Sequence, residues 1–478
     1  MFLRGPRNGI ASSSSAATTC SRSLSGFMRS TRRWGMWKAS EHRFSVLGLA
    51  RTGVAAANWL AMHGMDVLAS DPKPAGELPL DRLHPAVKTV PGRNEVREGD
   101  VVVISPGIKP HTPAWNLAHE KGSEVLSDID LFARLCPCPI VAVTGTDGKS
   151  TTTALIGELL RGAGNDTFVG GNIGWACMEG LDGLTPQSVA VLEVSCFQLT
   201  HCPTFSPAVA VVTNIAEDHV EYHGTFQAYV EAKQMIYANM GPGQRLVVNG
   251  DDPEIAKWRL PEGVEVRRFG WQDRFELWAD DRAVYVDGRR QHGHDELRLP
   301  GRHNVENIMA AVAAVEGRFA TPERFLPALR GFAGLEHRME FVAEIRGVSW
   351  YNDSKATNPH AATAVLNAFS DRFWLLAGGY EKGSDFSELG KLVGEKTLGA
   401  VLFGVTKHRI ADTIPAGHPV HLVENLPQAV QRAFELARPG QRVILAPACA
   451  SFGEFKDFEH RGHVFKELVR RLAQTRGA

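Results

Sequence analysis

The residues from Val141 to Leu160 have the types and the spacing expected of a phosphate-binding loop. An apolar, strand-like run ends in GTDGKST, and an apolar, helix-like run follows it. Glycines let backbone N–H groups approach phosphate oxygens, and the first turn of a helix favours anions. Lys149 would neutralise the β- and γ-phosphates of a nucleotide, and the hydroxyl of Ser150 or Thr151 would bind Mg²⁺. The sequence therefore predicts a nucleoside triphosphate site, against the alternative of an ordinary glycine turn that enters a capped helix.

This loop differs from the common P-loop at one position. The common motif carries a glycine five positions before Gly148, and this chain has Val143 there. The nucleotide chemistry must therefore belong to a family with a shortened loop.

A carboxylate follows a second apolar run in the same region. Glu193 ends the run VAVLE, where an acid of the Walker B type would bind Mg²⁺. A salt-bridge partner at the end of a strand is the alternative interpretation.

Three blocks of alternating strand-like and helix-like runs would position these groups. The first contains FSVLGLARTGVAAANWL from Phe44, MDVLASD up to Asp71, and DVVVISPGI. The second contains IVAVTG, VAVLEVS and AVAVVTNI, and the third contains WLLAGG and RVILAPA. Continuous apolar runs are typical of buried parallel strands, whose carboxyl ends carry functional residues. The sequence predicts an α/β fold with a Rossmann-like domain over 41–135, a central P-loop-type ATPase domain with a parallel sheet over 136–333, and a Rossmann-like C-terminal domain over 334–478.

The first block begins with a turn that approaches a dinucleotide-binding fingerprint. Gly48, Ala50 and Gly53 have the required spacing, and Asp71 follows about twenty residues later. The turn alone leaves open a nicotinamide-dependent oxidoreductase, but that interpretation does not explain GTDGKST or the motifs after it.

Composition excludes several classes of protein. The formal net charge is −1, which does not indicate binding to nucleic acid or membranes, and no apolar run reaches the roughly 18 residues of a spanning helix. The seven cysteines are scattered and form no CxxC pair, which is typical of reduced thiols in a cytoplasmic protein. Residues 1–40 hold seven Lys and Arg and no acid, so we expect this extension to be disordered or untranslated. It resembles a transit peptide, and the alternative is that translation starts at Met36.

Further motifs identify a family. GGNIG from Gly170, LEVSCFQL, TNIAEDHVEYHG, YVEAKQMIY, LPGRHNVENIMAAVAA, EHRMEF and YNDSKATNP follow one another along the chain. With GTDGKST, this set resembles the Mur ligase family, which includes the folylpolyglutamate synthases and whose phosphate loop begins one turn later than the common P-loop. SPGI, NDSKATN and the tail PACASFGEFKDFEHRG are most similar to the members that add D-glutamate. The resemblance covers roughly residues 44–470.

The resemblance implies an ATP-dependent ligase of peptidoglycan precursor synthesis. Such a ligase adds D-glutamate to UDP-N-acetylmuramoyl-L-alanine through an acyl phosphate, with two Mg²⁺ ions. It would act in the cytoplasm as a monomer on small molecules, without nucleic acid or membrane partners. Domain closure would bring the third domain over the nucleotide.

The resemblance also assigns residues to ATP, metal and catalysis. The implied ATP-binding residues are Gly145, Thr146, Asp147, Gly148, Lys149, Ser150, Thr151, Asn304, Asn307, Arg338 and Asp353. The implied metal ligands are Ser150, Glu193, His219 and Lys233, the last as a carbamate formed with CO₂, and the implied catalytic residues are Lys149, His219, Lys233 and Lys355. Taken alone, Lys233 would be a solvated helix residue, His219 a structural histidine, and Asn304 a helix cap.

The substrate residues follow in the same way. The implied UDP-substrate residues are Arg51, Thr52, Asp71, Lys73, Ser105 and Asn172, and the implied D-glutamate residues are Thr357, Lys382, Ser451 and Phe458. Phe458 could equally be a core residue. The chain departs from many relatives at Ala50 and Arg51, where they carry a glycine and then an apolar or small residue, and at Asp147, where they carry asparagine.

Two alternatives to this function remain within reach of the sequence. One is another amino-acid ligase of the same family. Those ligases differ from this chain in the first domain or in the tail. The other is a nucleotide-binding module without catalysis, and the retained Lys149, Glu193, His219, Lys233 and Lys355 argue against it.

Overall fold

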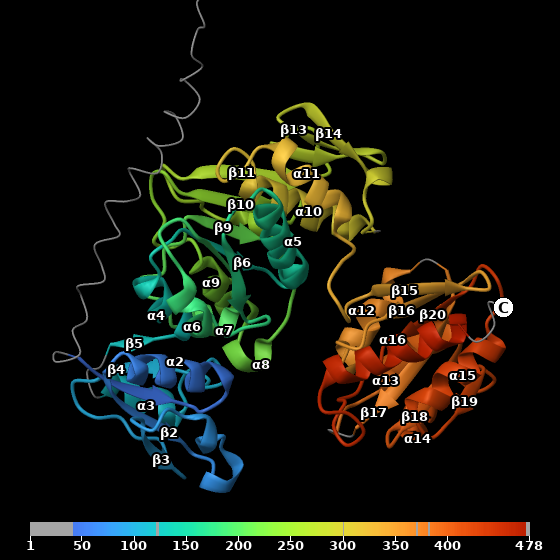
Figure 1. The fold of residues 1–478 in the computed structure, drawn as a ribbon, viewed down its shortest axis with the longest axis horizontal. Helices are drawn as coiled ribbons and strands as arrows, with labels where there is room; N and C mark the ends of the chain where they lie inside the picture. Colours follow the sequence, from blue (N-terminus) through green and yellow to red (C-terminus); the bar gives the residue numbers. More distant parts are fainter. Residues whose placement is uncertain (1–41, 121–123, 300, 370, 381–382, 475–478) are drawn as a thin grey trace, which may run out of the picture. The chain divides into compact units, whose positions relative to one another are not determined.

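The structure is a computed structural model that describes residues 42–474 except 121–123, 300, 370 and 381–382 (Figure 1). The predicted extension over 1–40 lies outside these residues. The chain divides into two compact units between Gly331 and Phe332. In the described part of the chain, no helix is both long and apolar enough to cross a bilayer.

The first unit begins with a five-stranded sheet of order β3-β2-β1-β4-β5, in which every neighbouring pair is parallel. Its strands are β1 (Arg43–Leu47), β2 (Asp66–Asp71), β3 (Lys88–Pro91), β4 (Val101–Ile104) and β5 (Val125–Leu126). Its helices are α2 (Arg51–Met62), α3 (Pro113–Glu120) and α4 (Asp128–Leu135). Strand β1 lies at the centre of the sheet, and its buried run Phe44–Leu47 explains why that segment reads as continuously apolar.

The same unit contains a nine-stranded sheet of order β14-β13-β12-β11-β10-β9-β6-β8-β7. The parallel strands are β6 (Ile140–Thr144), β7 (Thr167–Gly171), β8 (Val189–Glu193), β9 (Val209–Val212), β10 (Arg245–Asn249), β11 (Glu265–Gly270) and β12 (Leu277–Ala279). The antiparallel hairpin of β13 (Ala283–Val286) and β14 (Arg289–Gly293) extends the edge at β12. Strand β6 lies between β8 and β9, so the ends of these two strands flank the loop after β6.

Helices cover the nine-stranded sheet, and several of them carry residues of the candidate site. They are α5 (Lys149–Gly162), α6 (Cys177–Gly180), α7 (Cys196–Leu199), α8 (Val220–His223), α9 (Phe226–Gln234), α10 (Arg302–Val315) and α11 (Pro322–Gly331). Helix α5 packs against α10 and α11, as Figure 1 shows. One hydrophobic cluster includes Trp59, Phe132 and Ala142, so the two sheets of this unit share a continuous core.

The second unit is a six-stranded sheet of order β15-β16-β20-β17-β18-β19. Its strands are β15 (Glu340–Ile345), β16 (Val348–Asn352), β17 (Phe373–Gly379), β18 (Thr397–Gly404), β19 (Val420–Leu422) and β20 (Arg442–Leu445), and only β15 is antiparallel to its neighbour. Its helices are α12 (Pro359–Ala368), α13 (Ser387–Lys396), α14 (Lys407–Ala411), α15 (Leu426–Leu436) and α16 (Phe458–Gln474). Separate apolar clusters cover the two faces, because Leu375 belongs to one and Leu376 to the other. The predicted α/β fold with three parallel-sheet domains is thus confirmed.

Candidate active site

The phosphate loop (residues 145–151) connects β6 to α5, as predicted. Gly148 has φ +80, and a Cβ there would lie 2.3 Å from Oδ1 of Asn307, so the loop needs glycine at this position. Helix α5 begins at Lys149, which directs the first N–H groups of the helix toward the loop. The ammonium of Lys149 donates to the carbonyls of Gly145 (3.0 Å) and Thr146 (2.7 Å). Lys149 therefore rests on the loop that would hold the phosphates.

Two residues that the sequence analysis did not assign hold this loop from β9. The backbone N–H of Thr146 donates to the carbonyl of Asn214 at 2.9 Å, and that of Asp147 donates to Oδ1 of Asn214 at 2.8 Å. The Thr213 hydroxyl donates to the carbonyl of Asp147. The segment TNIAEDH was noted as a motif, but the position of β9 beside β6 was needed to give Thr213 and Asn214 this role.

Glu193 lies at the end of β8, next to the phosphate loop. The side chain is buried, with 3% exposure, and its register partner in β6 is Val143. Oε1 accepts from the amide of Asn172 at 2.7 Å, while Oε2 is buried without a hydrogen-bond partner among the described residues. A buried carboxylate oxygen without a partner costs free energy, which a bound cation would offset. Ser150, also buried, is the second residue of α5, and the hydroxyl and carboxylate oxygens of Ser150 and Glu193 fit the preference of Mg²⁺.

Lys233 is buried on α9, although an isolated reading of the sequence places it in solvent. Its exposure is 2%, and its ammonium donates to the carbonyl of Gly145 at 2.6 Å. The ring of Tyr229 lies 4.7 Å from the same nitrogen. Burial, and after it the positive charge of Lys149, lowers the pKa of Lys233 to about 7. The structure therefore brings Lys149 and Lys233 to the same carbonyl of the phosphate loop.

His219 precedes α8 with a left-handed backbone, φ +53. Its ring nitrogens face Asp218 Oδ2 at 3.3 Å and Glu221 Oε1 at 3.7 Å. The ring of Tyr229 is 6.4 Å from the His219 ring, and the Tyr229 hydroxyl hydrogen-bonds with Oγ1 of Thr146 at 2.8 Å. Tyr229, which the sequence analysis did not assign, thus connects His219 to the phosphate loop.

The two asparagines of GRHNVEN lie on one face of α10, as their spacing predicts. Asn307 donates to Oδ1 of Asn304 at 3.3 Å and accepts from the Thr152 hydroxyl at 3.2 Å. The helix begins at Arg302 after Gly301, so Asn304 lies inside it, and the alternative of an N-terminal cap is wrong. Asn307 therefore fixes α10 to the first turn of α5.

A pocket of about 370 Å³ in the first sheet holds part of the predicted UDP-substrate set. Arg51, Asp71 and Lys73 line it, together with Leu49, Ala50, Val54, Glu77, Leu78, Pro79 and Arg82. The carboxylate of Asp71 accepts from the N–H groups of Leu49 (2.8 Å) and Lys73 (3.0 Å), so it joins the two loops that form the pocket.

The remaining UDP-substrate residues lie elsewhere in the same unit. Thr52, Ser105 and Asn172 do not line that pocket: the Ser105 hydroxyl donates to the carbonyl of Gly48 at 3.0 Å, and Asn172 contacts Glu193. The guanidinium of Arg51 donates to the carbonyls of Gly174 (2.8 Å) and Gly171 (3.2 Å), on either side of Asn172. Arg51 thereby connects the pocket of the first sheet to the loop that holds Asn172.

The second unit brings together the loops after β16 and β20. Asp353 is buried with 6% exposure, and Oδ1 accepts from the N–H of Met339 at 3.0 Å. Burial raises the pKa of Asp353 to about 6, although the charge of Arg338 acts in the opposite direction. The ammonium of Lys355 lies 5.8 Å from the centre of the Phe458 ring.

Arg461 joins these loops, and sequence analysis did not assign it. Its guanidinium is fully buried and donates to Oγ and O of Ser354 (3.0 and 2.8 Å) and to the carbonyl of Cys449 (3.0 Å). Thr357 follows the Ser354 loop, Ser451 follows Cys449, and the Phe458 carbonyl accepts from the Ser354 hydroxyl at 2.7 Å. Three of the predicted D-glutamate residues thus lie on segments that Arg461 connects, and the fourth, Lys382, lies outside the described residues. The tail motif FEHRG contained this arginine, but nothing in it indicated burial.

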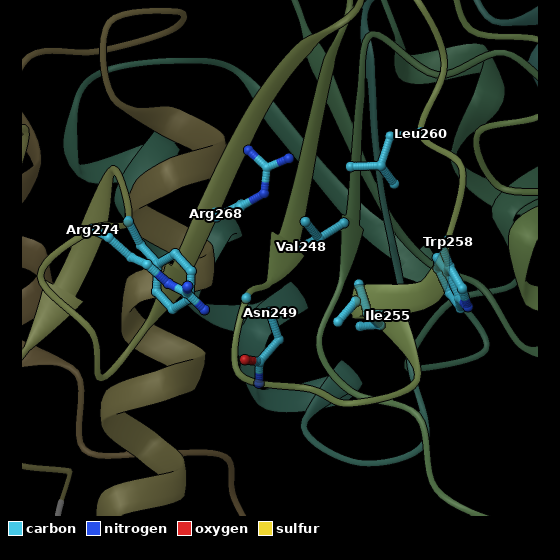
Figure 2. Close-up of a pocket in the computed structure, with 10 residues that line it drawn as sticks. Val248, Asn249, Ile255, Trp258, Leu260, Arg268 and Arg274 are labelled. Carbon is cyan, nitrogen blue, oxygen red and sulfur yellow. The ribbon is translucent and has the colours of Figure 1, made fainter.

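A second cavity, of about 490 Å³, opens beside the ends of β10 and β11 (Figure 2). Val248, Asn249, Gly250, Ile255, Ala256, Trp258, Leu260, Arg268, Arg274 and Phe275 line it. None of the predicted site residues is among them, so volume alone does not indicate where the chemistry occurs.

Comparison with known proteins matches each part of this chain to one family. Three family models match the chain: the MurD-like N-terminal domain of Mur ligases over residues 42–127, the Mur ligase middle domain over 143–315, and the glutamate ligase domain of Mur ligases over 337–449. The chain is 38% identical over 449 residues to the UDP-N-acetylmuramoylalanine–D-glutamate ligase of Syntrophus aciditrophicus, covering 91% of this chain and 99% of that protein. It is 40% identical over 445 residues to the ligase of the same name from Pelotomaculum thermopropionicum, covering 89% and 96%.

Solved structures share the fold. The UDP-N-acetylmuramate-alanine ligase of Thermotoga maritima superposes with a TM-score of 0.57 at 20% identity, covering 90% of this chain and 99% of that one. The MurF ligase of the same organism, solved with ADP, gives 0.55 at 18% identity, covering 80% and 97%. At such identities the likeness extends to the fold alone.

Proposed function

The chain belongs to the Mur ligase family, and from this membership we propose that it joins D-glutamate to UDP-N-acetylmuramoyl-L-alanine at the expense of ATP, in peptidoglycan precursor synthesis. The observation that carries this function is the similarity to D-glutamate ligases at 38–40% identity over about nine-tenths of the chain. The reaction forms an amide bond, so the protein is an ATP-dependent ligase.

The chemistry explains why a phosphate loop is needed. A carboxylate is a poor electrophile, and transfer of the γ-phosphate of ATP to the alanyl carboxylate gives an acyl phosphate. The amine of D-glutamate attacks its carbonyl carbon, and inorganic phosphate leaves with the P–O bond intact. The backbone N–H groups of the loop and Lys149 would bind the phosphates, with the Lys149 ammonium exchanging the carbonyls of Gly145 and Thr146 for phosphate oxygens.

The buried oxygens near the loop fit Mg²⁺. When bound, Mg²⁺ supplies positive charge that offsets the charge of the transferred phosphoryl group. Ser150, Glu193, His219 and a carbamate on Lys233 would together hold two ions. Oε2 of Glu193 supports its place in this set, because it is buried, has no hydrogen-bond partner among the described residues and can accept a cation.

Lys233 would become an anion by reaction with CO₂. The neutral amine attacks the carbon of CO₂, one proton leaves the nitrogen, and a carbamate results. Burial and the low pKa of about 7 support this assignment, since an ordinary lysine is almost wholly protonated at neutral pH. The neighbouring Lys149 would stabilise the negative charge.

The second unit would supply the amino-acid site and part of the nucleotide site. D-Glutamate carries two carboxylates, so its site should contain cations and hydrogen-bond donors. We assign Thr357, Lys382, Ser451 and Phe458 to it, and Lys355 to catalysis. Arg338 and Asp353 would bind the nucleotide.

The UDP group would occupy the pocket of about 370 Å³ that Arg51, Asp71 and Lys73 line. Thr52, Ser105 and Asn172 would contact the substrate beyond it. The family membership further suggests a cytoplasmic monomer that binds neither nucleic acid nor membranes.

Phosphate release from ATP tests the function. The purified chain, Mg²⁺ and UDP-N-acetylmuramoyl-L-alanine are mixed with D-glutamate, L-glutamate, L-alanine or L-lysine in separate reactions. We expect release with D-glutamate alone, and its loss in Lys149→Ala. Depleting CO₂ should slow the reaction and bicarbonate should restore it, but bicarbonate should not restore Lys233→Ala.

Each other outcome selects an alternative. Release with a different amino acid would make the protein another ligase of the family. ATP binding without release in any mixture would make it a nucleotide-binding module. A reaction rate that does not depend on CO₂ would refute the carbamate on Lys233 but would not refute the ligase activity.

A further inference from the structure

We propose that Glu336, His337 and His463 form a binding site for one divalent transition-metal ion of the zinc class. Glu336 and His337 lie in the segment before β15, and His463 lies on α16. One ligand atom of each residue lies within 4.8 Å of the others. Nε2 of His463 is 3.0 Å from Oε1 of Glu336, and Nε2 of His337 is 4.0 Å from the same oxygen. None of the three is among the residues assigned to Mg²⁺ or to the substrates.

The His337 ring indicates that a partner is missing. The residue is 2% exposed, and its Nε2 is buried without a hydrogen-bond partner in the described part of the chain. The backbone is held in the left-handed region, φ +62, where its N–H donates to Oε2 of Glu340 at 2.9 Å. The His463 ring lies against it edge-to-face, with centres 4.7 Å apart. The fold therefore holds a buried ring nitrogen toward the Glu336 carboxylate and the second imidazole.

The donor set selects the metal. Two imidazole nitrogens and one carboxylate oxygen, completed by water, are typical of zinc, whereas Mg²⁺ prefers oxygen donors. Zinc bonds of about 2.0–2.2 Å in tetrahedral geometry require ligand atoms roughly 3.4 Å apart. The distances of 3.0 and 4.0 Å from Oε1 lie on either side of this value. The side chains of Glu336 and His463 are 52% and 56% exposed, so both can adjust and the ion can enter from solvent.

The charges around the site favour a cation. The ammonium of Lys466 contacts Oε1 of Glu336, the oxygen that also faces the two histidines, and lies 2.9 Å from Oε1 of Glu340. Two carboxylates therefore face one ammonium, and a bound ion would share Oε1 of Glu336 with Lys466. Lys466 lowers the pKa of Glu336, and burial lowers the pKa of His337. A deprotonated carboxylate and a neutral imidazole are the forms of these side chains that bind metal.

A metal ion bound at Nε2 of His337 requires the ring proton to be on Nδ1. The groups around the ring allow this tautomer. The amide of Asn352 has two hydrogens and three acceptors nearby: His337 Nδ1 at 2.9 Å, Glu340 Oε2 at 3.0 Å and the Gly462 carbonyl at 3.5 Å. If the amide donates to Glu340 and Gly462, Nδ1 carries the proton. Oε2 of Glu340 lies 3.8 Å from Nδ1, longer than a hydrogen bond, so the ring must rotate slightly before Nδ1–H can donate to the carboxylate as in a metal-bound histidine.

Zinc titration of the full chain tests the site. Metal-free protein is titrated with Zn²⁺ by calorimetry in saturating Mg²⁺, and the His463→Ala and Glu336→Gln variants are compared with it. We expect each variant to bind one Zn²⁺ fewer, or that ion at least tenfold more weakly. Co²⁺ in place of Zn²⁺ should give the visible absorption of tetrahedral coordination, which both variants should lose.

His460→Ala is the matched control. His460 is an exposed histidine one turn earlier on α16, and its Nδ1 lies 3.3 Å from the backbone nitrogen of Lys456. This variant should bind Zn²⁺ like the parent chain. The proposal is overturned if the parent binds no Zn²⁺, or if His463→Ala and Glu336→Gln bind it as His460→Ala does.

Discussion

Asp353 shows at the scale of a residue that the candidate site carries a group whose charge opposes folding. Burial is the main reason why its pKa rises to about 6, and the hydrogen bond from Met339 and the charges of Arg338 and Lys355 only reduce the effect. Carboxyl groups with strongly perturbed pKa values cluster at functional sites. The proposed contact of Asp353 with the nucleotide is consistent with this.

The pKa of Asp353 predicts how stability depends on pH. Because the folded pKa lies above the ordinary value of about 3.9, the native state binds more protons than the unfolded state between about pH 4 and 6. Ionisation of Asp353 therefore lowers the free energy of unfolding progressively as pH rises through that window. Above the window the full destabilisation is present. Asp353→Asn, which keeps the Oδ1 acceptor for Met339, should stabilise the protein at pH 7–8 by roughly 1–3 kcal/mol.

Thermal unfolding of both proteins from pH 4 to 8 measures this difference, which should be small at pH 4. Activity of the variant should fall at the same time. Asp273→Asn, at an exposed position, serves as the control and should leave the pH profile unchanged. A variant that is less stable than the parent at pH 8 would refute the assignment of this cost to Asp353.

At the scale of elements, the phosphate loop depends on the contact between α5 and α10. Two consecutive threonines at the start of α5 are both buried, but only Thr152 donates to Asn307. The hydroxyl of Thr153 has no hydrogen-bond partner among the described residues. Asn307 is also the group that any side chain at Gly148 would meet. The contact therefore determines the shape of the loop.

The two threonines should respond differently to the same substitution. Thr152→Val removes a buried hydrogen bond and should lower the free energy of unfolding by about 1 kcal/mol. It should also weaken ATP binding several-fold, because Asn307 loses its link to α5. Thr153→Val removes a hydroxyl that has no partner in the part of the chain that the structure describes, and this change should be neutral or stabilising. Urea unfolding and ATP calorimetry measure both effects, and equal losses in the two variants would contradict the role of Asn307.

These elements also show what the sequence could and could not predict. Continuous apolar runs predicted β6, β8 and β9, because buried parallel strands leave that pattern locally. The loop and strand pattern assigned roles to Lys149 and Glu193, the family motifs assigned one to Lys233, and these roles stay predictions. The order of the strands is a long-range property, so the role of Asn214 could not be predicted from its neighbours in sequence. For the same reason the burial of Arg461 was missed, since charged residues usually lie at the surface.

At the scale of the whole molecule, the proposed mechanism draws on both compact units. Lys149 belongs to the unit before Phe332, and Lys355 belongs to the unit after Gly331. If both act in one reaction, the two units must reach the same substrates. Domain closure around ligands is the usual solution in enzymes of this kind.

Small-angle scattering should detect the closure. We expect the radius of gyration to decrease when a non-hydrolysable ATP analogue, UDP-N-acetylmuramoyl-L-alanine and D-glutamate are all present. The ATP analogue alone should produce a smaller decrease in the radius of gyration. In Lys149→Ala, the decrease should be smaller still. An unchanged scattering curve with every ligand bound would argue against closure.

The position of Arg461 has a consequence for how the protein is made. This arginine lies on the last helix, α16, yet it connects the loops at Ser354 and Cys449. A ribosome delivers the phosphate loop early and Arg461 only after more than three hundred further residues, so a nascent chain would complete its nucleotide loop long before the proposed amino-acid site. Formation of α16 is then the step that adds the proposed amino-acid site to a chain whose nucleotide loop is already complete.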